Sequence, residues 1–144
     1  MTATYGQRAH PRSLERVRVA DAMHRGVVTC RSDASLETVA RLMAAHRIHA
    51  VVVEPVGEAS GWTLVSDLDL AGAVTDRLSH ELTAGQIASS PELCVRPDET
   101  LVRAAQLMRE YETHHLIVLA RRADRPVGIV STLDVADVVA DLPR

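Results

Sequence analysis

The chain has 144 residues, 47% of them hydrophobic, and a formal net charge of −3, which suits one domain with its own core. Aromatic residues make up only 2%, and the charge offers no general attraction for polyanions. We therefore expect neither a nucleic-acid reader that stacks bases nor a membrane binder, since no apolar run approaches the roughly 20 residues that span a bilayer.

The N-terminal segment, residues 1–14, is polar and contains Gly6 and Pro11, so we expect a flexible arm. Residues 1–18 carry four arginines but no apolar stretch, and no secretory signal is expected. Cys30 and Cys94 are then expected to be free thiols in the cytoplasm.

Two helices are predicted early in the chain. Residues 19–23 favour a short helix. A longer helix should begin at Asp33, because a carboxylate is favourable beside the free amides of a first turn. Its apolar stripe recurs at helical spacing: Leu36, Val39, Ala40 and Met43.

Strands are indicated by runs of β-branched residues. A brief extended stretch at 27–30 precedes the long helix, and the continuous apolar run 50–53 is typical of a strand covered on both faces. The polar turn 54–60 reverses the chain into a returning strand at 62–65. Another helix should start near Ser66.

The second half repeats the first at a constant offset of 65 residues, which predicts one structural unit built twice. Among the matched pairs are Arg31/Arg96, Asp33/Asp98, Leu36/Leu101, Met43/Met108, His49/His114, Ser66/Ser131 and Asp69/Asp134. The same elements are thus predicted at 83–87, 93–95, from Asp98, at 116–119, at 127–130 and from Ser131. We expect repeats at 15–78 and 79–144, packed together because their linker is short.

Each half closes on a hydrophobic–Ser-x-x-Asp signature, at residues 62–69 and again at 128–134. Two such signatures in register, behind matched helices and strands, resemble the CBS domain pair, or Bateman module, over residues 17–141. The resemblance implies a mixed α/β (α+β) fold of two pseudo-twofold-related repeats. Each repeat would run helix–strand–helix–strand–strand–helix, with two clefts between the copies.

The resemblance also implies a regulatory role without enzymatic activity or a required cofactor. Many members bind adenosine-containing ligands, so AMP, ADP, ATP or S-adenosylmethionine are the expected ligands. The ligand would signal through a change of shape or through docking to a regulated protein, which the sequence does not name.

A Ser-x-x-Asp motif at a helix start has two interpretations. It forms a capping box, or it receives a ligand whose phosphate meets the helix N-terminus and whose ribose meets the carboxylate. The resemblance assigns a second-repeat site to Ser131, Asp134, Gly128, Thr132, His114, Leu93 and Pro91. It assigns a weaker first-repeat site to Ser66, Asp69, His49 and Val28.

Two substitutions favour the second site over the first. Thr63 stands where Gly128 allows close approach to the backbone. Asp67 stands where Thr132 stands, and its extra negative charge opposes a phosphate. The paired histidines, His49 and His114, either end a strand or contact phosphate more strongly when protonated.

Two other functions stay open. In a ligand-free interaction module the motifs would only cap helices. An enzyme would need a nucleophile, and only Cys94 with His114 offers one, since the nucleophile-elbow, Walker and zinc-protease motifs are missing. Metal ligands at suitable spacing are not evident, so no metal site is expected.

Helix faces around Leu70, Val74, Val135 and Val138 should stay apolar and exposed after the two repeats have packed. A twofold self-contact is the commonest way to cover such a face. We therefore expect a homodimer.

Overall fold

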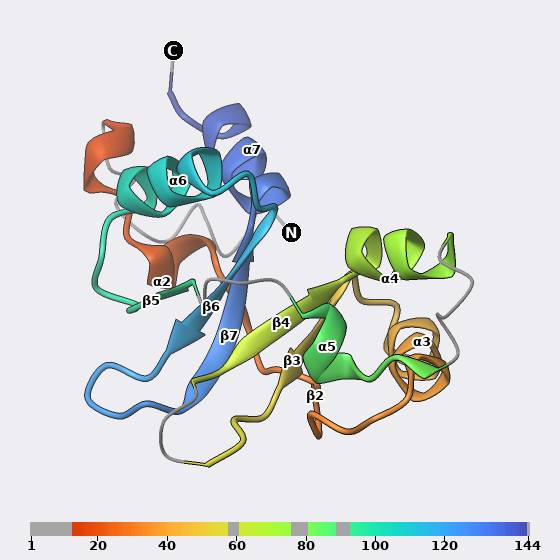
Figure 1. The fold of residues 1–144 in the computed structure, drawn as a ribbon. Coiled ribbons are helices and arrows are strands. Elements are labelled where there is room, and N and C mark those ends of the chain that lie inside the picture. The colour runs from red at the N-terminus through yellow and green to blue at the C-terminus, as the bar shows by residue number, and fades with distance from the viewer. Residues whose placement is uncertain (1–12, 58–60, 76–80, 89–92, 144) are drawn as a thin grey trace.

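Two small sheets lie against each other at the centre of this mixed α/β fold, and helices cover their outer faces (Figure 1). The computed structural model describes residues 13–57, 61–75, 81–88 and 93–143. Most of the expected N-terminal arm, most of the linker and Pro91 lie outside the described residues.

The first sheet has the order β2-β3-β4, with β2 parallel and β4 antiparallel to the central strand. Its register pairs Ala50 with Ser66 at the end where the chain enters the next helix. The elements of this half are β2 (Thr29–Cys30), α3 (Leu36–His46), β3 (Ala50–Val53), β4 (Thr63–Ser66) and α4 (Asp67–Val74). They match the predicted elements closely, because strands buried on both faces give unbroken apolar runs.

The second sheet has the order β1-β7-β6-β5. Its elements are β5 (Cys94–Val95), α6 (Leu101–Glu110), β6 (His115–Leu119), β7 (Pro126–Ser131) and α7 (Thr132–Ala140). Its fourth strand, β1 (His24–Arg25), comes from the first half of the chain and was not predicted. It pairs antiparallel with β7, His24 opposite Ile129 and Arg25 opposite Gly128.

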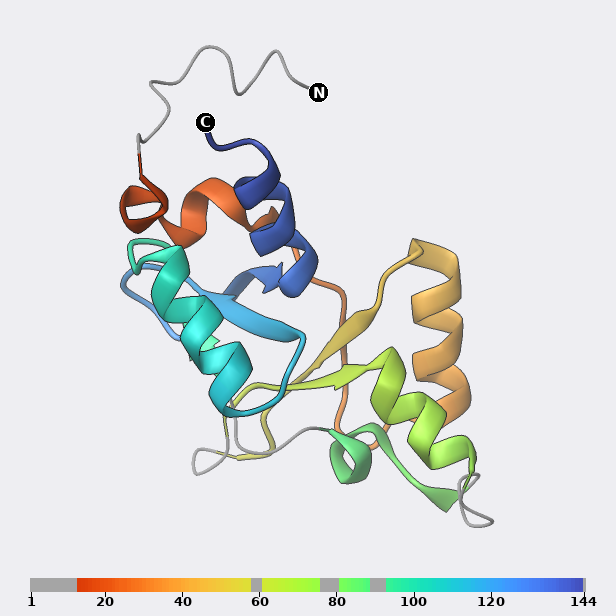
Figure 2. The same ribbon diagram turned by 90° about the horizontal axis from the view of Figure 1, so that it is seen from above.

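The two halves exchange their leading helices. The backbone amide of Val19 in α2 (Val19–Ala22) donates to Glu99 O at 2.8 Å, and that of Ala84 in α5 (Ala84–Ile87) donates to Ala34 O at 2.8 Å. These two bonds are related by the 65-residue offset. As a result α2 lies with α6 and α7, whereas α5 lies with α4 (Figure 2).

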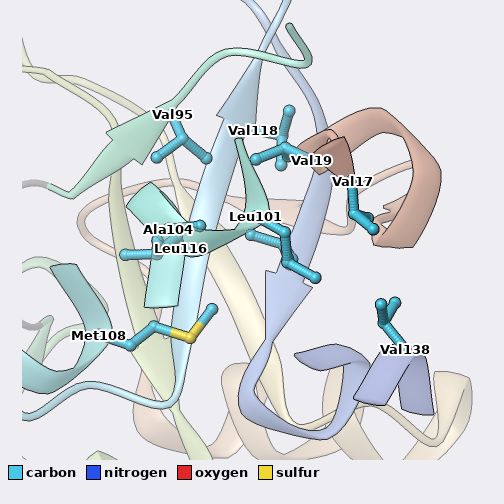
Figure 3. Close-up of a cluster of buried hydrophobic side chains, with 10 residues drawn as sticks. Val17, Val19, Val95, Leu101, Ala104, Met108, Leu116, Val118 and Val138 are labelled. Atoms are coloured by element: carbon cyan, nitrogen blue, oxygen red, sulfur yellow. The ribbon is translucent and has the colours of Figure 1, made fainter. Parts of the chain in front are cut away.

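The exchange determines how the cores are filled. Val17, which follows the 3₁₀ turn Leu14–Arg16, and Val19 are buried among Leu101, Leu116 and other residues of the second half (Figure 3). Ala84 is buried in the core of the first half. The two halves of the chain therefore complete each other's cores.

The predicted helix starts at Asp33 and Asp98 are wrong. Helix α3 begins after Ser35, whose Oγ accepts the amide of Thr38 at 3.1 Å, and α6 begins after Thr100, whose Oγ1 accepts that of Arg103 at 3.1 Å. A hydroxyl two residues later thus caps each helix. Asp33 instead accepts hydrogen bonds from Arg31, which hold the pKa of its carboxyl below the usual range.

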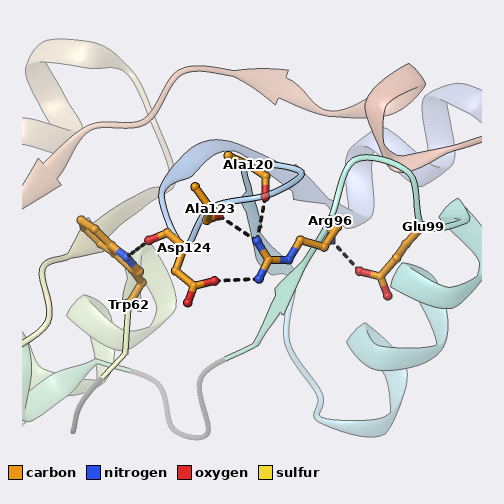
Figure 4. Close-up of polar contacts among 6 residues, drawn as sticks. All are labelled: Trp62, Arg96, Glu99, Ala120, Ala123 and Asp124. Atoms are coloured by element: carbon orange, nitrogen blue, oxygen red, sulfur yellow. Dashed lines mark hydrogen bonds and ion pairs between the residues drawn. The ribbon is translucent and has the colours of Figure 1, made fainter. Parts of the chain in front are cut away.

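Arg96 ties the β6–β7 turn together (Figure 4). Its guanidinium donates to the carbonyls of Ala120 and Ala123 and to the Asp124 carboxylate, each at 2.7 Å. The indole of Trp62, from the first half, donates to Asp124 O at 2.9 Å. This turn therefore links the two halves, in addition to the buried apolar side chains that lie between their two sheets.

The expectation of exposed faces around Leu70, Val74, Val135 and Val138 holds only for Val74. Val138 is buried in the second core, and Leu70 and Val135 pack partly against the cores, because they lie on the inner side of their helices. The exposed large apolar residues of α4 and α7 are instead two repeat-related pairs, at least half exposed: Leu68/Leu133 and Val74/Val139.

Candidate functional site

Both Ser-x-x-Asp motifs lie where a strand ends and a helix begins, and both form complete capping boxes. Ser66 Oγ accepts the Asp69 amide at 3.1 Å, while the Asp69 carboxylate accepts the Ser66 amide at 2.9 Å. The Ser131 and Asp134 pair repeats this geometry at 3.3 and 2.7 Å. The capping interpretation is therefore satisfied twice, and each motif also presents a helix N-terminus.

The two carboxylates have different surroundings. Asp134 is only 3% exposed, and its Oδ1 lies 2.7 Å from Nε2 of His24. Its Oδ2 accepts the Ser131 amide and, at 3.1 Å, the Ser131 hydroxyl. The Asp69 side chain belongs to a residue of intermediate exposure.

Gly128 was predicted to let a ligand approach the backbone, but in the structure the chain's own strand β1 lies against it. A Cβ added at this position would lie 2.3 Å from His24 O and 2.3 Å from Cε of Met23. Strand β1 can therefore run beside β7 only because residue 128 has no side chain. In the first half the equivalent residue, Thr63, carries a branched one.

His49 and Asp67 pair at the first helix start, with 2.8 Å between Nδ1 and Oδ2. This hydrogen bond lowers the pKa of Asp67, so the extra carboxylate stays ionised beside the imidazole. In the second half the amide of Thr132 donates to the carbonyl of His114, as Asp67 does to His49, but its side chain is a hydroxyl. The two helix starts therefore differ in charge.

His115 is the first residue of β6, and charged groups of both helix starts act on it. Burial lowers its pKa, and its charged surroundings are Asp67, Asp134, His114 and His49. Its Nδ1 is buried and has no hydrogen-bond partner among the described residues. The junction of the two halves thus holds several imidazoles and two carboxylates.

A pocket of about 340 Å³ opens between α6 and α7. Only some of the residues predicted for the second site line it. His114 and Thr132 line this pocket together with Met108 and Arg109. Gly128 is buried beneath β1, and Asp134 lies beneath His24. The residues that the motif places in one site therefore face two different environments.

Leu93 and Val28, the apolar residues that the resemblance assigns to the two sites, lie beside the short strands of the two sheets. The carbonyl of Leu93 accepts the amide of Ile117 at 3.1 Å, beside β5, which is the opposite edge of the sheet from β1. The carbonyl of Val28 accepts the amide of Val52 at 2.9 Å in the first sheet. The exchange of leading segments brings His24 to the second helix start and Met23 to Gly128 on the strand before it.

His24 is the residue that sequence reasoning missed. The residue 65 positions later is Ser89, so the repeat comparison gave no signal for it. Only the pairing of β1 with a strand about a hundred residues away brings it to Asp134.

The cysteines show no nucleophile–base arrangement. Cys94 is opposite Ile117 in the sheet, three residues from His114, which corresponds to about 10 Å along a strand. Cys30 is buried, and burial raises the pKa of its thiol; Cys30 and Cys94 are not joined in a disulfide. Within the described part of the chain, no three His, Cys or acidic side chains converge as a metal ion would require.

The fold and the duplicated helix starts agree with the family comparison. The CBS domain model matches residues 19–76 and 84–141, and the chain therefore belongs to the CBS domain family as a tandem pair. A comparison with curated protein sequences gave no match. Every helix in the described residues is too short or too polar to traverse a bilayer.

Solved structures share the fold at low identity. The hexameric CBS-CP12 protein from bloom-forming cyanobacteria is 22% identical, with a TM-score of 0.75 over 89% of this chain and 72% of that one. The CBS domain pair of protein MJ0100, in complex with 5′-methylthioadenosine and S-adenosyl-L-methionine, is 22% identical, with a TM-score of 0.74 over 86% and 96%. CBSX2 in complex with AMP is 21% identical, with a TM-score of 0.67 over 89% and 99%.

Proposed function

We propose that this protein is a regulatory module that binds an adenosine-containing ligand between its two CBS repeats. The observation that carries the proposal is the duplicated Ser-x-x-Asp helix start at the junction of the two halves. Each start offers amide donors and a hydroxyl beside a carboxylate, which are the groups that phosphate and ribose need. The adenosine ligands of the MJ0100 pair and of CBSX2 support the same ligand class.

In the second repeat, the N-terminus of α7 with Ser131 would meet the phosphate, and Asp134 would accept the ribose hydroxyls. His114 and Thr132 lie at the same helix start, on the side of the α6–α7 pocket. His24 lies at the helix start of this repeat, and Met23 lies against Gly128 on the preceding strand. The weaker first site would use Ser66, Asp69, Val28 and, once released from Asp67, His49.

Thermal melting with AMP, ADP, ATP and S-adenosylmethionine tests this function. A ligand at 100 times its dissociation constant adds about 2.7 kcal/mol of stability, or roughly 5–10 °C for a chain of this size. We expect at least one compound to raise the midpoint by that amount. If none does so at millimolar concentration, the ligand-binding function is contradicted.

A second candidate function is protein interaction through α4 and α7. It is favoured by the exposed pairs Leu68/Leu133 and Val74/Val139, which repeat the same apolar surface on both helices. We propose that this surface forms a homodimer, the commonest closed assembly. Light scattering should give a dimer mass for the wild type and a lower mass for a Leu68→Glu/Leu133→Glu variant. A monomer mass independent of concentration would contradict this.

A further inference from the structure

His24 occupies the carboxylate that a ribose would need. The Oδ2 of Asp134 is held by the capping box, so the oxygen left for a ligand is Oδ1. That oxygen already lies 2.7 Å from Nε2 of His24, and the carboxylate is 3% exposed, whereas the imidazole above it is 78% exposed. A ribose can reach Oδ1 only if the imidazole leaves.

The segment that carries His24 is held by few interactions. Strand β1 has two residues and lies at the edge of its sheet, where β7 is its neighbour. The next residue, Gly26, has a φ of +89°, and its amide donates to Val127 O at 2.8 Å. Since no atom lies within 4 Å of a Cβ built there, the glycine is needed for its backbone conformation and not for space.

The position of the segment allows it to move without unpacking a core. Helix α2, before it, packs in the second half, and β2, after it, pairs in the first sheet. His24, Arg25 and Gly26 belong to none of the three core clusters, and all three residues are exposed. Residues 24–26 are thus a link between the halves with Gly26 at one end.

We propose that residues 24–26 are an internal gate over the second-repeat site. The imidazole of His24 holds Asp134 while the site is empty, and the ribose of an adenosine 5′-phosphate takes its place on binding. The gate rests on the proposed ligand-binding function and adds the step by which it is regulated. Because residues 24–26 connect the two halves, opening of the gate on ligand binding changes this connection.

The gate makes a testable difference between variants of two exposed histidines. Titration calorimetry with AMP would compare wild type, His24→Ala, His24→Gln and the control His46→Ala, which removes an imidazole from the last turn of α3. His24→Ala should bind AMP about tenfold more tightly, because the empty site no longer has a hydrogen bond to a charged group to lose. His24→Gln, which keeps a donor, should gain less, and His46→Ala should match wild type.

A double variant shows whether the gain acts through Asp134. In a background of Asp134→Ala, the further change His24→Ala should no longer raise the affinity for AMP, since the two residues form one interaction. Thermal midpoints show whether each variant is folded at the temperature of the titration. If His24→Ala is unfolded there, the comparison is made with His24→Gln.

Each outcome decides between the gate and the site. If His24→Ala binds AMP and wild type does not, the gate is supported. Equal or weaker binding by His24→Ala than by wild type, or a gain that survives Asp134→Ala, overturns the gate and leaves the ligand-binding function standing. Absence of AMP binding in every protein overturns the gate as stated for adenosine 5′-phosphates, while a response to another compound in the melting panel would still support the function.

Discussion

The two Ser-x-x-Asp helix starts have the same capping box and different surroundings. Asp134 is sealed by His24 and by its own capping serine, whereas Asp69 is partly exposed near the His49–Asp67 pair. The neighbouring segment makes the difference, because β1 lies beside β7 only where Gly128 leaves room. A duplicated motif therefore does not by itself give a duplicated site.

The largest effect on this comparison should come from filling the space at Gly128. In Gly128→Ala the new Cβ would overlap His24 O, a backbone atom, so strand β1 must move. We expect a loss of about 1–3 kcal/mol in the free energy of unfolding, measured with urea. The control is Gly72→Ala in α4, where no atom lies within 4 Å and a gain of about 0.5–1 kcal/mol is expected. A loss of the same size in both variants would contradict the close approach of β1 to Gly128.

The next effect separates the two aspartates by stability. Capping alone predicts equal costs for Asp69→Ala and Asp134→Ala, about 1 kcal/mol each. The structure predicts a higher cost for Asp134→Ala, about 2–3 kcal/mol, because a buried carboxylate with three donors is lost. Urea unfolding of both variants measures the difference, and equal costs would show that the His24 contact adds nothing.

The smallest effect is a pH dependence that comes from His115. Its pKa is lowered in the folded protein, mainly by burial, so the unfolded chain binds the proton more readily. Stability should therefore fall as pH drops through about 6.5, the usual histidine value, and level off below the folded pKa. Asp67 does not contribute here, since its lowered pKa affects stability only near and below 3.8.

Replacing His115 isolates this contribution. His115→Leu should flatten the decline in the free energy of unfolding between pH 7.5 and about 5.5. His46→Ala, which removes an exposed imidazole, should keep most of it. A His115→Leu profile as steep as that of wild type would assign the decline to other groups.

The fold could be predicted well from sequence, because its signals are local or periodic. The 65-residue offset revealed two units, and unbroken apolar runs such as 50–53 predicted buried strands. The helix starts were misplaced by two residues because both an aspartate and a hydroxyl residue were available, and Ser35 supplied the cap.

The site could be predicted only in part, because its decisive contacts are not local. The exchange of α2 and α5 is a tertiary arrangement that leaves no mark on the repeat pattern. A strand of two residues has no periodicity, so β1 and the histidine that it brings to Asp134 were missed.

Titration calorimetry of wild type, Asp134→Ala and Asp69→Ala with AMP tests the central claim most directly. The account predicts that Asp134→Ala lowers affinity at least about tenfold, because the ribose contacts are lost, and that Asp69→Ala lowers it much less. Equal losses in the two variants would contradict the ranking of the sites. If wild type binds AMP and neither variant loses affinity, both motifs are helix caps and the proposed site is wrong.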